Sequence, residues 1–413
     1  MKRLYKHVIT AVLLFHCTAI SAQRFDDFFT DNTLRLDYSF TGDTGKQDIF
    51  VDELNMIPRW YGRKNRLAEL PLRGNGNITV RDSKTQQVIY RHSFSTLFQE
   101  WLATKEAKHT RKAFQNVFLV PFPKHDVDIT VELEDYHCNT VATLTHHVCP
   151  EDILIRHIGE RHITPYITLQ AAADTSNCIH ISYVAEGYKE SEMDSFVNDA
   201  KAATEALFAH EPFKTMRNRF NITAVLSQSK DSGASEPSNG IWKNTALHSH
   251  FDTFYSDRYL TTLNIKTLHD ILAGTPYEHI IILVNTEKYG GGGIYNSYNL
   301  SYTKGKNFKP VVVHEFGHSF GGLADEYDYG NDDPMYFPDI EPWEPNITTK
   351  HDFKGKWENL IKDNKAGFIE GGGYQQKGVY RGFKDCRMRT NDVPEFCLVC
   401  QQALMKLIKF YTE

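Results

Sequence analysis

The sequence predicts a protein of mixed α and β structure, in which a β-sandwich-like region over residues 23–160 precedes an α/β region over residues 161–413. Before residue 160, short stretches alternate between apolar and polar residues, as half-buried strands do. Later, apolar strands alternate with an amphipathic helix, an order that favours a parallel sheet with crossover helices. A chain of 413 residues is long enough for two or three domains.

The first region contains five stretches with a strand-like pattern and turn residues between them. They lie at 77–80, 87–90, 117–120, 127–133 and 141–144. Such spacing favours a β-sandwich, and one helix is expected near 97–108. The adjacent His146 and His147 would point to opposite faces of a strand, so they do not form one metal site. We therefore expect an accessory domain here.

The second region begins after a short polar transition at 160–177. Residues 179–184 predict a buried strand, and an apolar stripe from Met193 to Phe208 predicts a helix. Further strands are expected at 220–226 and 280–284, with a long polar loop at 227–250 and a terminal helix over 397–410. These elements make up the predicted α/β region.

The segment from Val311 to Tyr327 contains the pattern His314-Glu-Phe-Gly-His318. Histidines four residues apart on a helix lie on one face, where both can bind one zinc ion. Glu315 can then act as a general base on a water bound to that ion, whose pKa zinc lowers toward ~7. Three valines before His314 predict that the helix enters a buried layer. The pattern therefore predicts a catalytic zinc site.

A third metal ligand is expected shortly after this helix. Gly321 and Gly322 are suited to end the helix and turn the chain back. Two carboxylates follow at once, Asp325 and Glu326, and either one could bind the metal.

Four glycines follow Tyr289 just before this helix. They lack the Gly-Lys-Ser/Thr ending of a phosphate-binding loop. We expect a flexible turn that leads into an edge strand at 294–303 beside the zinc helix. Such an edge offers free backbone groups to an extended peptide, although an ordinary loop would have the same pattern.

Residues 1–22 have the pattern of a secretory signal. A basic start precedes an apolar run that is far shorter than the ~20 residues of a membrane span, and small residues end it. Cys17 raises the alternative of a lipoprotein, but His16 does not fit the residue expected before a lipidated cysteine. We expect a secreted, periplasmic or cell-surface protein with no transmembrane span after cleavage.

The net charge of the chain limits the classes of partner that it can bind. A net charge of −6 is mild for this length and does not favour nucleic acid. The partner we expect is a protein or peptide substrate, and the sequence predicts no oligomeric state.

Six cysteines follow the signal segment, which permits disulfides in an exported protein. The one we favour joins Cys386 to Cys397 or Cys400.

The segment His314–Tyr327 resembles the active-site segment of the M64 metallopeptidases, often labelled IgA peptidases. Other stretches resemble recurrent stretches of that family in the same order. They are Ala185–Tyr188, Glu211–Phe213, Arg219–Asn221, Leu283–Asn285, Lys288–Gly292 and Phe396–Cys400. The resemblance covers about residues 175–405, and the region before 160 resembles the family's N-terminal domain less specifically.

This resemblance implies a metzincin-like zinc peptidase domain with a twisted mixed sheet and an active-site helix, and a methionine turn under the metal, where Met388 falls. The usual third histidine would stand at Ala324, so the third ligand must differ. Asp325 has the same offset from Gly322 as the usual ligand has from its glycine. We therefore expect His314, His318 and Asp325 as ligands of Zn²⁺ and Glu315 as the catalytic base, with Glu326 the alternative ligand or a partner of the ligands.

The function expected from these residues is that of a zinc endopeptidase. A zinc amidase that acts on cell-wall or glycan amides would have similar residues, but a narrow pocket instead of an open cleft. A non-catalytic surface binding protein is the third hypothesis, and the intact histidines and Glu315 argue against it.

Overall fold

A computed structural model describes residues 24–330, 335–351 and 355–413 of the chain. The predicted signal segment 1–22, with Cys17, lies outside the described residues. Within the described part, no helix combines the length and apolar character that crossing a membrane requires. The fold is mixed α and β with several sheets, as the sequence predicts.

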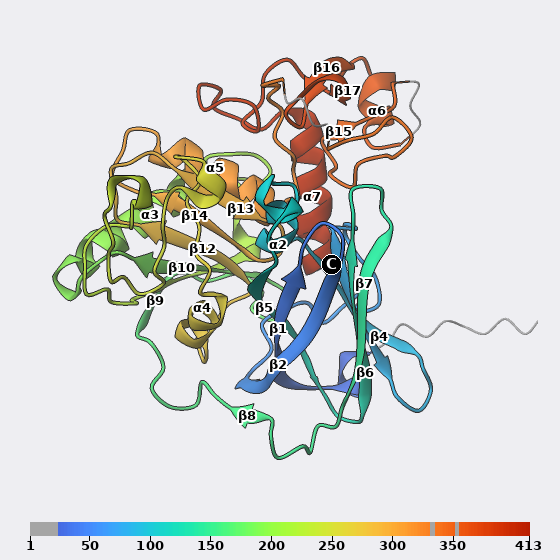
Figure 1. Cartoon of the computed structure of the whole chain (residues 1–413), viewed down its shortest axis with the longest axis vertical. Coiled ribbons are helices and arrows are strands. Elements are labelled where there is room, and N and C mark those ends of the chain that lie inside the picture. The colour runs from blue at the N-terminus through green and yellow to red at the C-terminus, as the bar shows by residue number, and fades with distance from the viewer. Residues whose placement is uncertain (1–23, 331–334, 352–354) are drawn as a thin grey trace, which may run out of the picture.

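The N-terminal strands form two four-stranded sheets, drawn in blue and teal in Figure 1. Their strands are β1 Phe29–Gly42, β2 Gln47–Pro58, β3 Gly76–Asp82, β4 Val88–Phe94, β5 Lys112–Pro123, β6 Val127–Glu134, β7 Thr140–Val148 and β8 Arg156–His157. One sheet has the order β5-β1-β2-β8 and the other β4-β3-β6-β7. Every second residue of β6 is buried, which confirms the predicted alternation. Two short helices, α1 Phe25–Phe28 and α2 Leu97–Leu102, accompany these sheets.

A six-stranded sheet dominates the second region. Its strands are β9 Tyr166–Gln170, β10 Ile179–Glu186, β11 Phe220–Val225, β12 His279–Val284, β13 Gly291–Ile294 and β14 Tyr298–Tyr302. The order is β13-β14-β12-β10-β11-β9. Strand β10 pairs in parallel with β11 and β12, and β12 pairs in parallel with β14, which confirms the expected parallel sheet. The two edge strands, β9 and β13, are antiparallel to their neighbours.

The two faces of this sheet contribute to different hydrophobic cores. Successive residues of a strand point to opposite faces. On β12, Ile281 and Leu283 therefore pack with the helices α3 Met193–Phe208, α5 Phe308–Ser319 and α7 Leu398–Thr412. Ile280 and Ile282 join the core that also contains the N-terminal sheets and helix α4 Ile265–Leu272. The N-terminal region thus covers one face of the sheet, and α5 lies on the other.

The C-terminal part adds a small three-stranded sheet, at the top of Figure 1. It comprises β15 Ile347–Thr348, β16 Ile369–Gly372 and β17 Gln375–Arg381, next to the short helix α6 Glu358–Lys362. Helix α7 follows this sheet and returns the chain to the core of the second region.

Candidate active site

Helix α5 positions the two histidines of the sequence pattern. Val311, Val312 and Val313 are buried, so the helix is fixed in the core as predicted. His314 and His318 lie one turn apart, and their Nε2 atoms are 3.0 Å from each other. Their side chains are 14% and 16% exposed, so each imidazole remains partly accessible to solvent.

The chain turns sharply where α5 ends. Gly322 has a φ of +57°, a conformation that glycine adopts without steric cost. Its backbone N–H donates to the carbonyl of His318 at 2.9 Å. The turn brings Asp325 back to the helix, where its Oδ1 lies 3.1 Å from His314 Nε2 and 3.3 Å from His318 Nε2. The structure therefore brings the three predicted metal ligands together.

Backbone carbonyls orient both imidazoles. His314 Nδ1 lies 3.0 Å from the carbonyl oxygen of Arg387, and His318 Nδ1 lies 2.6 Å from that of Leu323. A carbonyl oxygen only accepts hydrogen bonds, so each Nδ1 carries the proton and each Nε2 presents its lone pair. The hydroxyl of Tyr374 donates to the other oxygen of Asp325. Neither Tyr374 nor the two carbonyls can be recognised as partners from sequence spacing.

The arrangement of lone pairs fits a metal ion. Two Nε2 atoms and Asp325 Oδ1 face one another at 3.0–3.3 Å, and Oδ1 has no hydrogen-bond donor. Tetrahedral zinc with bonds of ~2.0 Å would separate such ligand atoms by about 3.3 Å. The local field also favours positive charge. Burial lowers the pKa of His318, but the Asp325 carboxylate outweighs burial and raises the pKa to about 9, so the site favours a positive charge that either a proton or a metal ion can supply.

The side chain of Glu315 extends from α5 toward strand β13. A Cβ atom added to Gly291 would stand 2.6 Å from Glu315 Oε1, so the glycine makes room for this carboxylate. Burial raises the pKa of Glu315, and the positive charges of His314 and His318 oppose part of this increase. A carboxylate with a raised pKa takes up a proton more readily at neutral pH, as a general base must.

Glu326, the alternative ligand, faces elsewhere. Its Oε1 lies 3.3 Å from Cys400 Sγ and accepts a hydrogen bond from Asn346 at 3.0 Å. Asp325 and Glu326 are consecutive in the chain but belong to two different groups of potential metal ligands. This arrangement favours Asp325 as the third ligand beside the histidines.

Two family models match the chain. The one described as IgA Peptidase M64 matches residues 167–366 and 362–408, and the one described as Peptidase M64 N-terminus matches residues 24–145. The chain belongs to the IgA peptidase M64 family. Because M64 peptidases are metallopeptidases, membership supports peptidase activity. No curated protein matches the chain.

The glycine run of this M64 peptidase differs from the expected turn. Residues 291–294 themselves form the edge strand β13, whereas the expected edge strand at 294–303 contains the inner strand β14. Glycines are needed here for close approach, because a Cβ on Gly293 would lie 2.5 Å from the carbonyl oxygen of Glu315. The outer edge of β13 is partly occupied, since the N–H of Leu260 donates to the carbonyl of Gly291 at 3.4 Å.

We expect Gly293→Ala to destabilise this M64 peptidase and to lower its activity. The added methyl group would lie 2.5 Å from Glu315 O and 3.0 Å from His318 Cβ, so β13 and α5 must separate. Overpacking of this kind costs about 1–3 kcal/mol. Thermal unfolding and peptidase assays measure both effects. Gly367→Ala is the matched control, because its Cβ meets nothing within 4 Å. Equal melting temperatures for the two variants would contradict the close approach.

The N-terminal region contributes a carboxylate near the site. Glu100 on α2 accepts a hydrogen bond from the hydroxyl of Tyr259. Burial raises the pKa of Glu100 to about 7, while Tyr259 and the charge of His318 oppose the increase. Asn296, two residues after β13, donates from Nδ2 to the carbonyl of Ser93 at 2.8 Å. The N-terminal region therefore borders the site, which its sequence does not predict.

The expected disulfide is absent from the C-terminal part. Cys386, Cys397 and Cys400 are free thiols in the structure. Cys400 Sγ lies 3.7 Å from Cys386 Sγ and 3.6 Å from Cys397 Sγ, far beyond the ~2.05 Å of a disulfide bond. Cys400 is thus almost equally far from both possible partners.

Proposed function

We propose that this protein is a secreted zinc endopeptidase. His314, His318 and Asp325 would hold the ion, which when bound supplies Lewis-acid polarisation of a carbonyl group and lowers the pKa of water toward ~7. The observation that carries this proposal is the convergence of two Nε2 lone pairs and one carboxylate oxygen within 3.0–3.3 Å, with no donor between them.

Glu315 is proposed as the general base. Its carboxylate takes a proton from the attacking water and later gives it to the leaving amine. Two features support this role. Glu315 directly follows the first histidine on α5, and the absence of a side chain at Gly291 leaves space for its carboxylate.

We propose that the region over residues 161–413 is metzincin-like and catalytic, and that the region over 23–160 is an accessory domain. The antiparallel edge strand β13 beside α5 supports the first part. Met388 supports it too, because a Cβ on Gly317 of α5 would lie 2.6 Å from the Met388 sulfur. The pattern at 1–22 supports secretion.

Removal of metal tests this proposal. We expect a strong chelator to abolish hydrolysis of a denatured protein substrate, and added zinc to restore it, because the three ligand atoms act only through a bound ion. Metal content is measured on the same samples by mass spectrometry. Full activity in protein shown to contain no metal would refute a zinc mechanism. Hydrolysis of glycan amides but of no peptide would favour the amidase hypothesis.

A further inference from the structure

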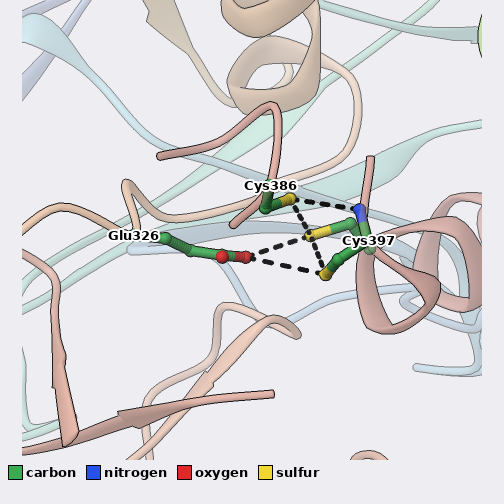
Figure 2. A group of neighbouring side chains, drawn as sticks. Glu326, Cys386 and Cys397 are labelled. Atoms are coloured by element: carbon green, nitrogen blue, oxygen red, sulfur yellow. Dashed lines mark hydrogen bonds between the residues drawn. The ribbon is translucent and has the colours of Figure 1, made fainter. Parts of the chain in front are cut away.

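A second group of potential metal ligands lies apart from the histidines. It consists of Glu326, Cys386, Cys397 and Cys400, called the thiol cluster below. Figure 2 shows the Glu326 carboxylate and the cysteine sulfurs pointing toward one another. The four residues come from three segments: the chain after α5, the Met388 segment, and the start of α7. Cys386, Cys400 and Glu326 are 0% exposed and Cys397 is 8% exposed.

From this geometry we propose that the thiol cluster binds a structural zinc ion. Structural zinc sites have four protein ligands, mostly cysteine, in a closed tetrahedron. Zinc–sulfur bonds of ~2.3 Å set the sulfur–sulfur edges of such a tetrahedron at about 3.8 Å. The observed separations of Cys400 Sγ are 3.7 and 3.6 Å. Glu326 Oε1 lies 3.3 Å from Cys400 Sγ and 4.0 Å from Cys397 Sγ. An oxygen and a sulfur bound to one tetrahedral zinc ion are about 3.5 Å apart, a value between these two distances.

The hydrogen bonds around the thiol cluster suit thiolates. The backbone N–H of Cys397 donates to Cys386 Sγ at 3.2 Å, and that of Met388 approaches it at 3.5 Å. Cys397 is the N-cap of α7, and Cys400 lies in its first turn, where the helix dipole favours negative charge. Donors that orient and stabilise metal ligands are a regular part of metal sites.

The Glu326 carboxylate forms no ion pair with a described residue, although Arg381 lies near enough for its charge to act on it. Its Oε2 is buried and has no hydrogen-bond donor, while Oε1 receives one from Asn346. A buried carboxylate whose charge no cation neutralises is costly, and a metal ion bound at Oε1 would balance that charge. Arg389 does not fill this role, because its guanidinium donates to the backbone carbonyl of Glu326 and to Asp328.

Two other uses of these cysteines fit the structure less well. A redox-active Cys-x-x-Cys pair needs a sulfur that an outside thiol can attack, but Cys400 is fully buried and Cys397 nearly so. A disulfide would join two of the thiols and leave the third beside Glu326. It would not account for a carboxylate at ligand distance from two sulfurs.

The proposed ion would stabilise the segments that carry the residues of the active site. Glu326 follows Asp325 directly, and its N–H donates to the carbonyl of Met388 at 2.8 Å. One zinc ion would therefore join the segment that carries Asp325, the segment that carries Met388, and α7. This inference stands apart from the peptidase proposal, because none of the four ligands belongs to the group around His314.

Metal counting on the full chain tests the inference. We expect two zinc ions per chain in the natural protein and one in His318→Ala, which removes a ligand from the other group only. Cys400→Ala should also lose one zinc ion. Cys178→Ala is the matched control, since Cys178 is a buried free thiol outside the cluster, and its zinc content should be unchanged.

Cobalt substitution in His318→Ala keeps the test decisive if Cys400→Ala does not fold. Cobalt bound to thiolates absorbs through sulfur-to-metal charge transfer, and the histidine group contains no sulfur. We expect this absorption in His318→Ala loaded with cobalt. A zinc-free His318→Ala without the cobalt signal would overturn the inference, as would a disulfide between two cluster cysteines in peptide mapping.

Discussion

Replacement of Glu315 by glutamine is expected to lower peptidase activity by at least ~100-fold while the metal stays bound. The amide keeps the size of the carboxylate and fits the same space beside Gly291. It cannot accept a proton from water, so general-base catalysis is lost, a contribution that typically amounts to 10²–10⁴-fold. Initial rates on a denatured protein substrate, together with zinc content by mass spectrometry, measure the two effects.

The comparison needs a variant that alters the surroundings of Glu315 but leaves its carboxylate in place. Tyr259→Phe serves this purpose, because Tyr259 donates to Glu100 at the border of the site. We expect it to reduce the rate far less than Glu315→Gln does. Near-normal turnover in Glu315→Gln, with zinc retained, would exclude Glu315 as the base and transfer that role to another carboxylate near the site. Glu100 is then the first to examine.

Local patterns made much of the fold predictable. The alternation through 127–133 corresponds to β6, and the apolar stripe from Met193 corresponds to α3. The spacing of His314 and His318 and the glycines after them predicted a helix, its end and a returning carboxylate. Each of these features depends on residues within a few turns of one another.

Contacts between distant segments were not predictable in the same way. The strand formed by Gly291–Ile294 reads as a turn in the sequence, because its glycines are explained only by the nearness of α5. The approach of Glu100 to the site depends on packing between the N-terminal sheets and the larger sheet. Sequence spacing carries no signal for either contact.

The thiol cluster is predictable from local sequence in part, and depends on a contact between distant segments for the rest. Cys397 and Cys400 form a visible pair, and Cys386 is near in sequence. The fourth member, Glu326, lies 60 or more positions away and directly follows a ligand candidate of another group. Its sequence position suggested a competitor of Asp325. The structure shows instead that the two carboxylates face different groups.

Asp325→Ala is expected to remove the metal from the histidine group and to abolish activity. Asp325 Oδ1 lies 3.1 and 3.3 Å from the two Nε2 atoms, and without it only two protein ligands remain. Catalytic zinc sites use three protein ligands. Metal content after dialysis and the peptidase rate are measured together, with His318→Ala as the reference for a lost ligand.

Glu326→Ala is the matched comparison, and the location of the remaining metal distinguishes the two variants. If the thiol cluster binds zinc, each variant loses one ion, so counting alone does not separate them. Asp325→Ala should keep the sulfur-to-cobalt charge-transfer absorption and lose activity. Glu326→Ala should lose that absorption and retain measurable activity, because losing a residue that supports the ligands typically costs ~10–100-fold rather than all function. An active Asp325→Ala beside an inactive Glu326→Ala would reverse the assignment of the third ligand.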